Sequence, residues 1–186
     1  MKATGIVRRI DDLGRVVIPK EIRRTMRIRE GDPLEIYTNR EGEVIFKKYS
    51  PIGELSAFAG EYADTLAKIG SLQVIVTDRD AVIATGGISK KEYADKQVSA
   101  ALERIMENRQ PYFRHTGDEP VMAIDDSNSL IVRCAMPIIS EGDLIGCVCS
   151  LCTADDADKK EEQTERSAEE KLVQTAAVFL SRQHDS

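Results

Sequence analysis

Pro19 divides the stretch RVVIPKEIRRTM into two segments of different character. The β-branched run before it, residues 15–18, is typical of a strand. Proline cannot donate to a sheet ladder, but it fits the first turn of a helix, where the backbone N–H has no partner. The sequence therefore predicts that a strand ends at Ile18 and that a short helix runs from about Pro19 to Met26 or Arg27.

The helix predicted after Pro19 carries its charge on one side. At about 100° per residue, its basic side chains fall within a wedge of roughly 100°, whereas Ile22 and Met26 point the other way. The basic residues of this wedge are Lys20, Arg23, Arg24 and Arg27. One face of the helix is therefore basic, and the other is suited to packing.

Two hairpins are predicted on either side of this helix. Residues 5–10 and 15–18 have the composition of strands joined by a turn, in which Gly14 can take the positive φ that such a turn needs. Residues 29–32 favour a second turn, and residues 33–48 then favour a second hairpin. Alternation in this hairpin predicts four inward-facing residues, which are Leu34, Ile36, Val44 and Phe46.

The first fifty residues differ in charge from the rest of the chain. Residues 1–50 hold twelve Lys and Arg against eight Asp and Glu, a balance of +4, whereas residues 51–186 have a balance of −10. This asymmetry indicates a basic module joined to an acidic domain, unless the charges cluster by chance. So short a module has a marginal core, and this one contains no Cys or His for a disulfide or a zinc site. Association of two interleaved copies is the remaining common way to stabilise it.

Residues 3–50 resemble the swapped-hairpin DNA-binding domain of the AbrB family of transition-state regulators. The resemblance rests on the stretches LGRVVIPKEIRR and REGD. It implies an obligate dimer that exchanges strands between its subunits and binds double-stranded DNA. It places the main phosphate and groove contacts at Arg8, Arg15, Arg23 and Arg24. Supporting contacts are expected from Lys2, Arg9, Lys20 and Arg27.

Arginine suits these positions on chemical grounds as well. Its planar guanidinium can grip a phosphate or a guanine edge with two N–H groups. Neutralising several phosphates releases counterions, which supplies most of the non-specific affinity for DNA. Taken singly, each of these arginines could instead be a solvated residue in a weak ion pair.

The rest of the chain has the pattern of a mixed α/β domain. A helix is predicted over residues 51–69, with Ser50 as its cap. Ser89 and Glu92 form a capping-box signature, which predicts a second helix to about Asn108. Strands are expected within residues 72–87, near residues 121–125, and at residues 129–139 and 143–152, before a final helix at about residues 165–183.

This order of helices and antiparallel strands resembles a GAF domain. The predicted fold class is α+β, with a swapped-hairpin, β-rich dimeric domain at residues 1–50 and a GAF-like domain at residues 51–186. Together the two domains are similar to the sporulation regulators of spore-forming bacteria. That resemblance implies a transcription regulator that activates and represses late, forespore-stage genes. The GAF-like domain would assemble the protein and could bind a small-molecule effector, while no cofactor is implied.

The two helices at the ends of the second domain are expected to lie side by side. Terminal helices of a GAF-like fold commonly leave an apolar strip that a second copy can cover. The candidate residues of this strip are Phe58, Tyr62, Leu66, Leu172 and Phe179, of which some are expected to pack on their own sheet. If the two domains pair with different partners, the protein becomes a tetramer, a dimer of dimers, whose linked heads gain avidity for DNA.

The four cysteines are Cys134, Cys147, Cys149 and Cys152. Within a strand, Cys147 and Cys149 share one face and Cys152 lies on the other, which argues against a common zinc site. Free cysteine also behaves as a small buried hydrophobe. Packing in the core is therefore expected, with metal binding and redox chemistry, as in the GAF-type cysteine-dependent reductases, as the alternatives.

Other functions have weaker support in the sequence. No group of residues indicates a catalytic site, so an enzyme is not expected, and the glycine pair at residues 86–87 is a weak signal for phosphate binding. Swapped-hairpin domains also occur in antitoxins, but those carry short tails rather than a patterned domain like residues 51–186. No apolar run approaches the roughly 18 residues of a membrane span, so a cytoplasmic protein is expected, in the forespore by resemblance.

Overall fold

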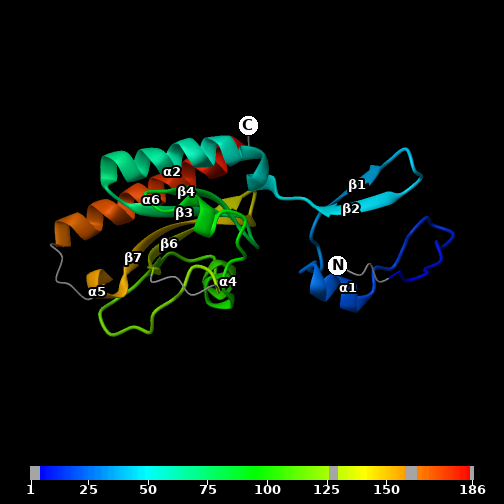
Figure 1. The fold of residues 1–186 in the computed structure, drawn as a ribbon, viewed down its shortest axis with the longest axis horizontal. Helices are drawn as coiled ribbons and strands as arrows, with labels where there is room; N and C mark the ends of the chain where they lie inside the picture. The colour runs from blue at the N-terminus through cyan, green and yellow to red at the C-terminus, as the bar shows by residue number, and fades with distance from the viewer. Residues whose placement is uncertain (1–4, 126–129, 158–162, 185–186) are drawn as a thin grey trace. The chain divides into compact units, whose positions relative to one another are not determined.

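The computed structural model describes residues 5–125, 130–157 and 163–184. The chain divides into two compact units, Met1–Tyr49 and Ser50–Ser186, each of which is described by itself (Figure 1). Lys2, one of the predicted DNA contacts, lies outside the described residues.

The first unit consists of one short helix and one hairpin. Helix α1 (Lys20–Thr25) begins one residue later than predicted, because Pro19 occupies its N-cap position. Strands β1 (Leu34–Thr38) and β2 (Val44–Lys48) pair antiparallel, with Ile36 opposite Phe46. The predicted turn at residues 29–32 is confirmed, since Gly31 has a φ of 83° and the Arg29 N–H donates to Asp32 Oδ2 over 2.8 Å.

The first predicted hairpin forms its turn but not its strands. Gly14 has a φ of 77°, and its N–H donates to the Asp11 carbonyl over 3.1 Å. Residues 5–10 and 15–18 nevertheless belong to no sheet, so the prediction of two strands there is wrong for the single chain. A lone two-stranded hairpin is marginal in water, and within the described residues the first unit has no third strand to support it.

The inward-facing residues predicted for the second hairpin also need correction. Ile36 and Val44 are 64% and 58% exposed, and Phe46 is also exposed. One hairpin beside a six-residue helix has no second layer that would cover either face of the ladder. The apolar alternation is therefore present in the sequence but is not buried within one chain.

The second unit is a five-stranded antiparallel sheet with helices on both faces. The strand order is β4-β3-β7-β6-β5. The strands are β3 (Gln73–Thr77), β4 (Val82–Gly86), β5 (Tyr112–Phe113), β6 (Leu130–Ser140) and β7 (Asp143–Thr153). All of these except β5 were predicted from the sequence, and the apolar runs of β6 and β7 form the centre of the sheet.

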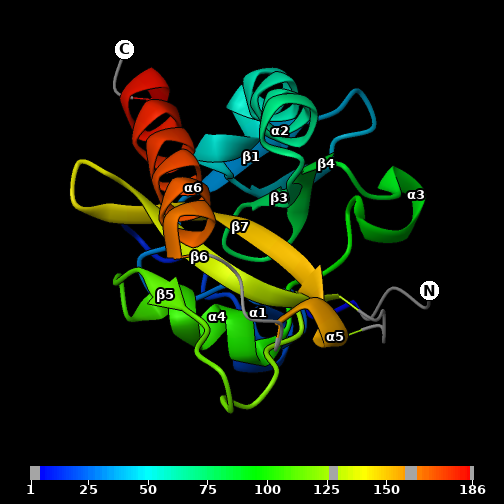
Figure 2. The same cartoon turned by 90° about the vertical axis from the view of Figure 1, so that its left-hand side faces the viewer.

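Two long helices cover one face of this sheet (Figure 2). They are α2 (Ser56–Gly70), which follows the 3-10 helix η1 (Pro51–Leu55), and α6 (Gln163–His184). Ser50 caps η1 as predicted, since its hydroxyl accepts the Gly53 N–H over 3.2 Å. The other face packs against α3 (Lys90–Tyr93) and α4 (Ala100–Glu107), and α5 (Ala154–Ala157) follows β7.

The helix predicted from Ser89 to Asn108 is wrong, because the chain there forms two short helices. The segment between α3 and α4 pairs with β4 instead: the Val82 N–H donates to the Lys96 carbonyl over 2.9 Å. Asp95 has a φ of 61°, which ends the first helix. Ser99 is the residue that caps α4, since its hydroxyl accepts the Leu102 N–H over 3.0 Å.

The strand predicted near residues 121–125 is present only as isolated bridges, Val98 to Ile124 and Met122 to Ile131. Residues 126–129, which precede β6, lie outside the described residues. The loop therefore runs beside the sheet without extending it as a full strand.

Candidate nucleic-acid interface

The predicted DNA contacts lie on two segments of the first unit. Arg8 and Arg9 lie in segment 5–10, which has no regular secondary structure, and Arg23 and Arg24 lie on α1. Their side chains are exposed and form no hydrogen bond or ion pair with any residue that the structure describes. Lys20 at the start of α1 is exposed in the same way. These cations are therefore available to an anionic partner.

Arg27 does not lie on the basic face where the helical wedge placed it. Helix α1 ends in a Schellman motif, in which the Ile28 N–H donates to the Arg23 carbonyl over 2.7 Å and the Arg27 N–H to the Arg24 carbonyl over 3.3 Å. Arg27 itself takes the left-handed conformation, with a φ of 51°, and is half-buried. The helix thus stops before Arg27, and the helical spacing beyond Thr25 no longer applies.

Arg15 differs from Arg8, Arg9, Arg23 and Arg24 because it contacts a carboxylate. Its Nε donates to Asp11 Oδ2 over 2.8 Å. Asp11 Oδ1 also accepts the backbone N–H groups of Leu13 and Arg15, over 3.1 and 2.8 Å. The Arg15 backbone N–H and then its guanidinium hold the pKa of Asp11 below its usual value. This contact was not predicted from the sequence, although aspartate is a preferred first residue of a turn.

The first unit exposes apolar side chains along its segments without regular secondary structure and its hairpin. Val7 is 93% exposed and Val17 is 72% exposed. Further exposed residues are Ile6, Ile10, Leu13, Val16, Ile36, Tyr37, Val44, Ile45 and Phe46. Exposed apolar surface on this scale marks an interaction site in a soluble protein.

The predicted apolar strip on the terminal helices is only partly exposed. Phe58 and Leu172 are exposed, whereas Tyr62 and Phe179 are half-buried. Leu66 is 4% exposed and packs in the core beneath α2, so the prediction that it lies on an open strip is wrong. Leu66 belongs to the same buried helical face as Ala59 and Ala63, whereas Phe58 lies about 100° away from Ala59.

The cysteines pack in the core, as predicted. All four are buried, and Cys147 and Cys149 lie on the same face of β7 with their sulfur atoms 3.5 Å apart. Burial raises the pKa of Cys134 and Cys152, and the hydrogen bond with Cys147 raises that of Cys149. A protonated, buried thiol is a poor nucleophile.

The glycine pair at the end of β4, Gly86 and Gly87, has a packing role. A Cβ atom on Gly86 would collide with the backbone of Ala63 in α2, and one on Gly87 would lie close to the Leu72 carbonyl. The pair therefore lets the helix approach the sheet, which accounts for both glycines without a phosphate.

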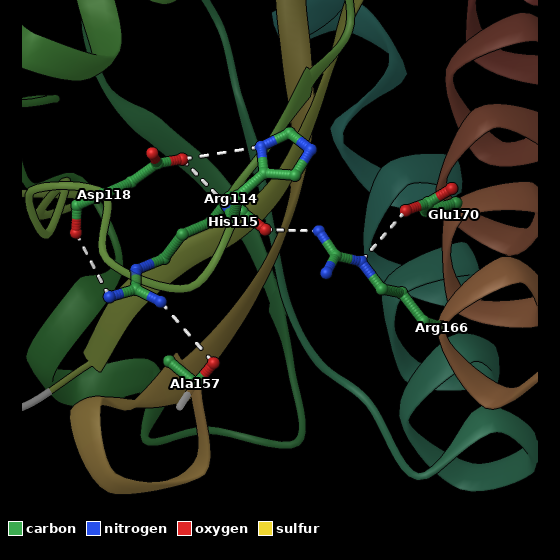
Figure 3. Close-up of polar contacts among 6 residues, drawn as sticks. All are labelled: Arg114, His115, Asp118, Ala157, Arg166 and Glu170. Atoms are coloured by element: carbon green, nitrogen blue, oxygen red, sulfur yellow. Dashed lines mark hydrogen bonds and ion pairs between the residues drawn. The ribbon is translucent and has the colours of Figure 1, made fainter. Parts of the chain in front are cut away.

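A buried arginine that the sequence analysis did not single out ties three segments of the second unit together (Figure 3). Arg114 is 6% exposed, and its guanidinium donates to the Asp118 carbonyl over 3.2 Å and to the Ala157 carbonyl over 3.4 Å. Its own carbonyl accepts a hydrogen bond from Arg166 of α6. The His115 backbone N–H lowers the pKa of the Asp118 carboxyl in the same loop. These contacts hold the loop, α5 and α6 together.

Comparison with known proteins agrees with this division of the chain. A protein-family model described as stage V sporulation protein T C-terminal, transcription factor, matches residues 54–185. The chain is also 53% identical to stage V sporulation protein T of Bacillus subtilis, over 98% of each chain. This chain belongs to the stage V sporulation protein T family. The predicted resemblance to the sporulation regulators is thereby confirmed.

The N-terminal part of this family member has its own relatives. The chain is 46% identical to the transition state regulatory protein AbrB of Bacillus subtilis over 44% of this chain and 82% of that one. A solution structure of the N-domain of the transcription factor AbrB is 63% identical, over 26% of this chain and 92% of that chain, with a TM-score of 0.24. A second family model, described as antidote-toxin recognition MazE, bacterial antitoxin, matches residues 7–53.

The second unit has the GAF fold. The GAF domain of a phosphoenolpyruvate-protein phosphotransferase from Acinetobacter has a TM-score of 0.50 at 9% identity, over 73% of this chain and 88% of that chain. The predicted α+β class, with an AbrB-like part followed by a GAF-like part, is thereby confirmed. Among the described residues, no helix has the length and apolar composition to span a membrane.

Proposed function

We propose that this protein is a selective DNA-binding transcription regulator that binds double-stranded DNA through the first unit. The observation that carries the proposal is the set of exposed side chains of Arg8, Arg9, Arg23 and Arg24, which have no partner among the described residues. Unpaired guanidinium groups retain their full capacity to bind phosphates and base edges. Arg15, which is held by Asp11, completes the arginine set.

The regulated genes follow from the family rather than from the geometry. A relative that matches 98% of the chain is a sporulation protein, and the family model that matches residues 54–185 describes a transcription factor. The proposed role is activation and repression of late, forespore-stage genes, in the cytoplasm of the forespore. Residues 1–50 bind DNA in this proposal, and residues 51–186 assemble the protein.

The exposed apolar residues of the first unit support a dimer. Val7, Val17 and Ile36 are each more than half exposed in the single chain. A second copy that pairs its own residues 5–10 and 15–18 with this hairpin would cover them and complete the strand ladder. We propose that strand exchange between two copies builds the DNA-binding head.

The second unit supplies a second association surface in this proposal. Phe58 and Leu172 are exposed on the paired helices α2 and α6, beside Tyr62 and Phe179. Pairing of these helices with a different copy would link two heads into a tetramer, a dimer of dimers. Two linked heads raise each other's effective concentration on adjacent DNA segments. A small-molecule effector could act by changing this assembly.

Neither alternative function is favoured. The pKa of Cys134, Cys149 and Cys152 is raised, which opposes the reactive thiolate that a cysteine-dependent reductase needs. We therefore propose that the protein has no enzymatic activity. The match to an antitoxin model ends at residue 53, whereas the transcription-factor model accounts for residues 54–185.

The test of DNA binding uses the two arginines of α1. Arg23→Ala and Arg24→Ala should weaken binding to a fluorescent duplex, measured by anisotropy, without unfolding the chain. For each phosphate that the variant no longer neutralises, the log–log slope of affinity against salt should fall by about 1. Arg104→Ala is the matched control, because it removes the same charge from an exposed position on α4 of the second unit. An unchanged affinity and slope in the double variant would exclude α1 as the DNA-binding face.

A further inference from the structure

The contact between Asp11 and Arg15 leaves part of the arginine free. Among the residues that the structure describes, Asp11 Oδ2 accepts a hydrogen bond only from the Nε of Arg15, over 2.8 Å. A guanidinium has five N–H donors, and its four terminal ones, on Nη1 and Nη2, form the fork that grips a guanine edge or a phosphate. No hydrogen bond or ion pair engages this fork within the part of the chain that the structure describes. The Nε of Arg15 is therefore bound by Asp11, whereas Nη1 and Nη2 remain available to DNA.

The anchor itself is fixed by the turn that contains it. Asp11 Oδ1 accepts two backbone N–H groups, from Leu13 and Arg15, and the Asp11 carbonyl accepts the Gly14 N–H over 3.1 Å. The positive φ of Gly14 closes this turn. An arginine that is ordered before DNA arrives loses less side-chain entropy on binding than a free one.

A carboxylate such as Asp11 is unfavourable in a surface that is proposed to bind DNA. A carboxylate repels phosphate, so by charge alone Asp11 would weaken binding to every DNA sequence. The neighbouring Asp12 carries the same charge, and its side chain forms no hydrogen bond or ion pair with the described residues. Substitution of Asp12 removes a negative charge alone, whereas substitution of Asp11 removes a negative charge and the contact with Arg15. Comparing the two variants therefore distinguishes the effect of charge from the effect of the contact.

We propose that Asp11 is a positioning residue that orients the guanidinium fork of Arg15 and so determines the selectivity of DNA binding. This inference rests on the proposed DNA-binding function. It predicts opposite effects of Asp11→Asn on two kinds of DNA. Selected DNA should bind more weakly, because the fork is no longer aimed, whereas scrambled DNA should bind equally or more tightly, because a negative charge is gone.

The experiment measures affinity of the full chain for two duplexes by fluorescence anisotropy. One duplex is selected by the wild-type protein from a random-sequence pool, and the other is its scrambled counterpart. Asp11→Asn should lower the ratio of the two affinities by about 5- to 10-fold, the discrimination expected when one bidentate contact is misplaced. Asp12→Asn, the matched control, should leave the ratio unchanged. In an Arg15→Ala background, Asp11→Asn should lower the ratio no further.

Several results would overturn the inference. An unchanged ratio in Asp11→Asn, when Arg15→Ala lowers it, would show that Arg15 acts without its anchor. An equal decrease in the Arg15→Ala background would show that Asp11 acts through the turn and not through Arg15. A wild-type protein that binds neither duplex would overturn the proposed function together with this inference.

Asp11→Asn is expected to fold, because the asparagine oxygen can still accept the two backbone N–H groups, and circular dichroism checks that the fold is retained. If it does not fold, a second variant, Arg15→Lys, tests the proposal. Arg15→Lys preserves the charge, but its single ammonium cannot contact Asp11 and present a two-pronged donor to DNA at once. It should lower the ratio to the same extent as Asp11→Asn, and a wild-type ratio in Arg15→Lys would contradict the proposal.

Discussion

The ring of Tyr62 in α2 stacks on the ring of Phe179 in α6, with their centroids 5.0 Å apart and their planes inclined by 29°. The two helices run side by side over the same face of the sheet (Figures 1 and 2). The stacked pair is half-buried, so it joins the two helices of one chain and still presents an edge to solvent. Phe58 and Leu172 flank the pair and are exposed. This arrangement makes the helix pair the proposed surface for a second copy.

Phe58→Glu should therefore break the tetramer into dimers while leaving the fold intact. Phe58 is 49% exposed, so its substitution removes only part of a side chain's packing within its own chain, whereas a carboxylate in a buried apolar interface costs several kcal/mol. Light scattering of the full chain measures the change. Ala57→Glu is the control, because it adds the same charge to an exposed position about 100° further round the helix. A wild-type dimer, or a Phe58→Glu variant that is still tetrameric, would contradict the proposed second interface.

Helix α2, helix α6 and strands β3, β4, β6 and β7 could be predicted from the sequence because their apolar residues repeat with clear periods. The helix predicted after Ser89 failed for a reason that lies elsewhere in the chain. Residues 94–98 hydrogen-bond to β4 and to the turn before it, and local capping signals do not report such long-range pairing. The strands expected before and after Gly14 need a ladder that the described single chain does not provide.

The candidate site was predictable in its residue types but not in its contacts. The exposure of Arg23 and Arg24 follows from their spacing on α1, and Arg27 departs from it because the helix ends at Thr25. The link between Asp11 and Arg15 depends on the conformation of a turn, and a spacing of four residues outside a helix does not specify it. Leu66 was predicted to lie on the open strip because it is apolar, but it lies on the buried face of α2 with Ala59 and Ala63.

Gly86→Ala should destabilise the second unit by about 1–3 kcal/mol, because the new methyl group would overlap the Ala63 carbonyl and push α2 away from the sheet. Gly60→Ala is the opposite control, since a Cβ there meets no atom within 4 Å and lies within α2. It should stabilise the unit by about 0.5–1 kcal/mol. Chemical unfolding followed by circular dichroism compares the two variants. Equal destabilisation by both would refute the packing role of Gly86.

Two buried serines should respond to alanine substitution in opposite directions. The Ser150 hydroxyl lies in the core and has no hydrogen-bond partner among the described residues, so Ser150→Ala should raise the free energy of unfolding by about 1 kcal/mol. The Ser99 hydroxyl donates to the Met122 carbonyl over 2.6 Å and caps α4, so Ser99→Ala should lower the free energy of unfolding by about 1–2 kcal/mol. The same unfolding measurement checks both signs. A loss of stability in Ser150→Ala comparable to that in Ser99→Ala would contradict this assignment.

The buried thiols should make the second unit less stable in alkaline solution. Burial raises the pKa of Cys134 above the ordinary value of 9.0, and burial likewise raises that of Cys152. As the pH rises above about 9, the unfolded chain releases these protons while the folded chain keeps them. The unfolded state then binds fewer protons, so the free energy of unfolding falls with pH, by up to about 1.4 kcal/mol per pH unit for Cys134. Below pH 9 both states are protonated, and this contribution is fully retained.

Cys134→Ala isolates one of these thiols. The variant will be less stable than the wild type at every pH because it leaves a small cavity, but its stability should fall less steeply between pH 9 and pH 10. The pH range stops there because burial also raises the pKa of Tyr112 above its ordinary value of 10.0, which adds a second alkaline effect. Guanidinium unfolding at several pH values gives the free energy of unfolding as a function of pH for both proteins. In the difference between the two curves, the contributions of the titratable groups that the proteins share cancel. If the two curves stay parallel across this range, Cys134 does not keep its proton in the folded chain, and the burial of its thiol beneath α6 is refuted.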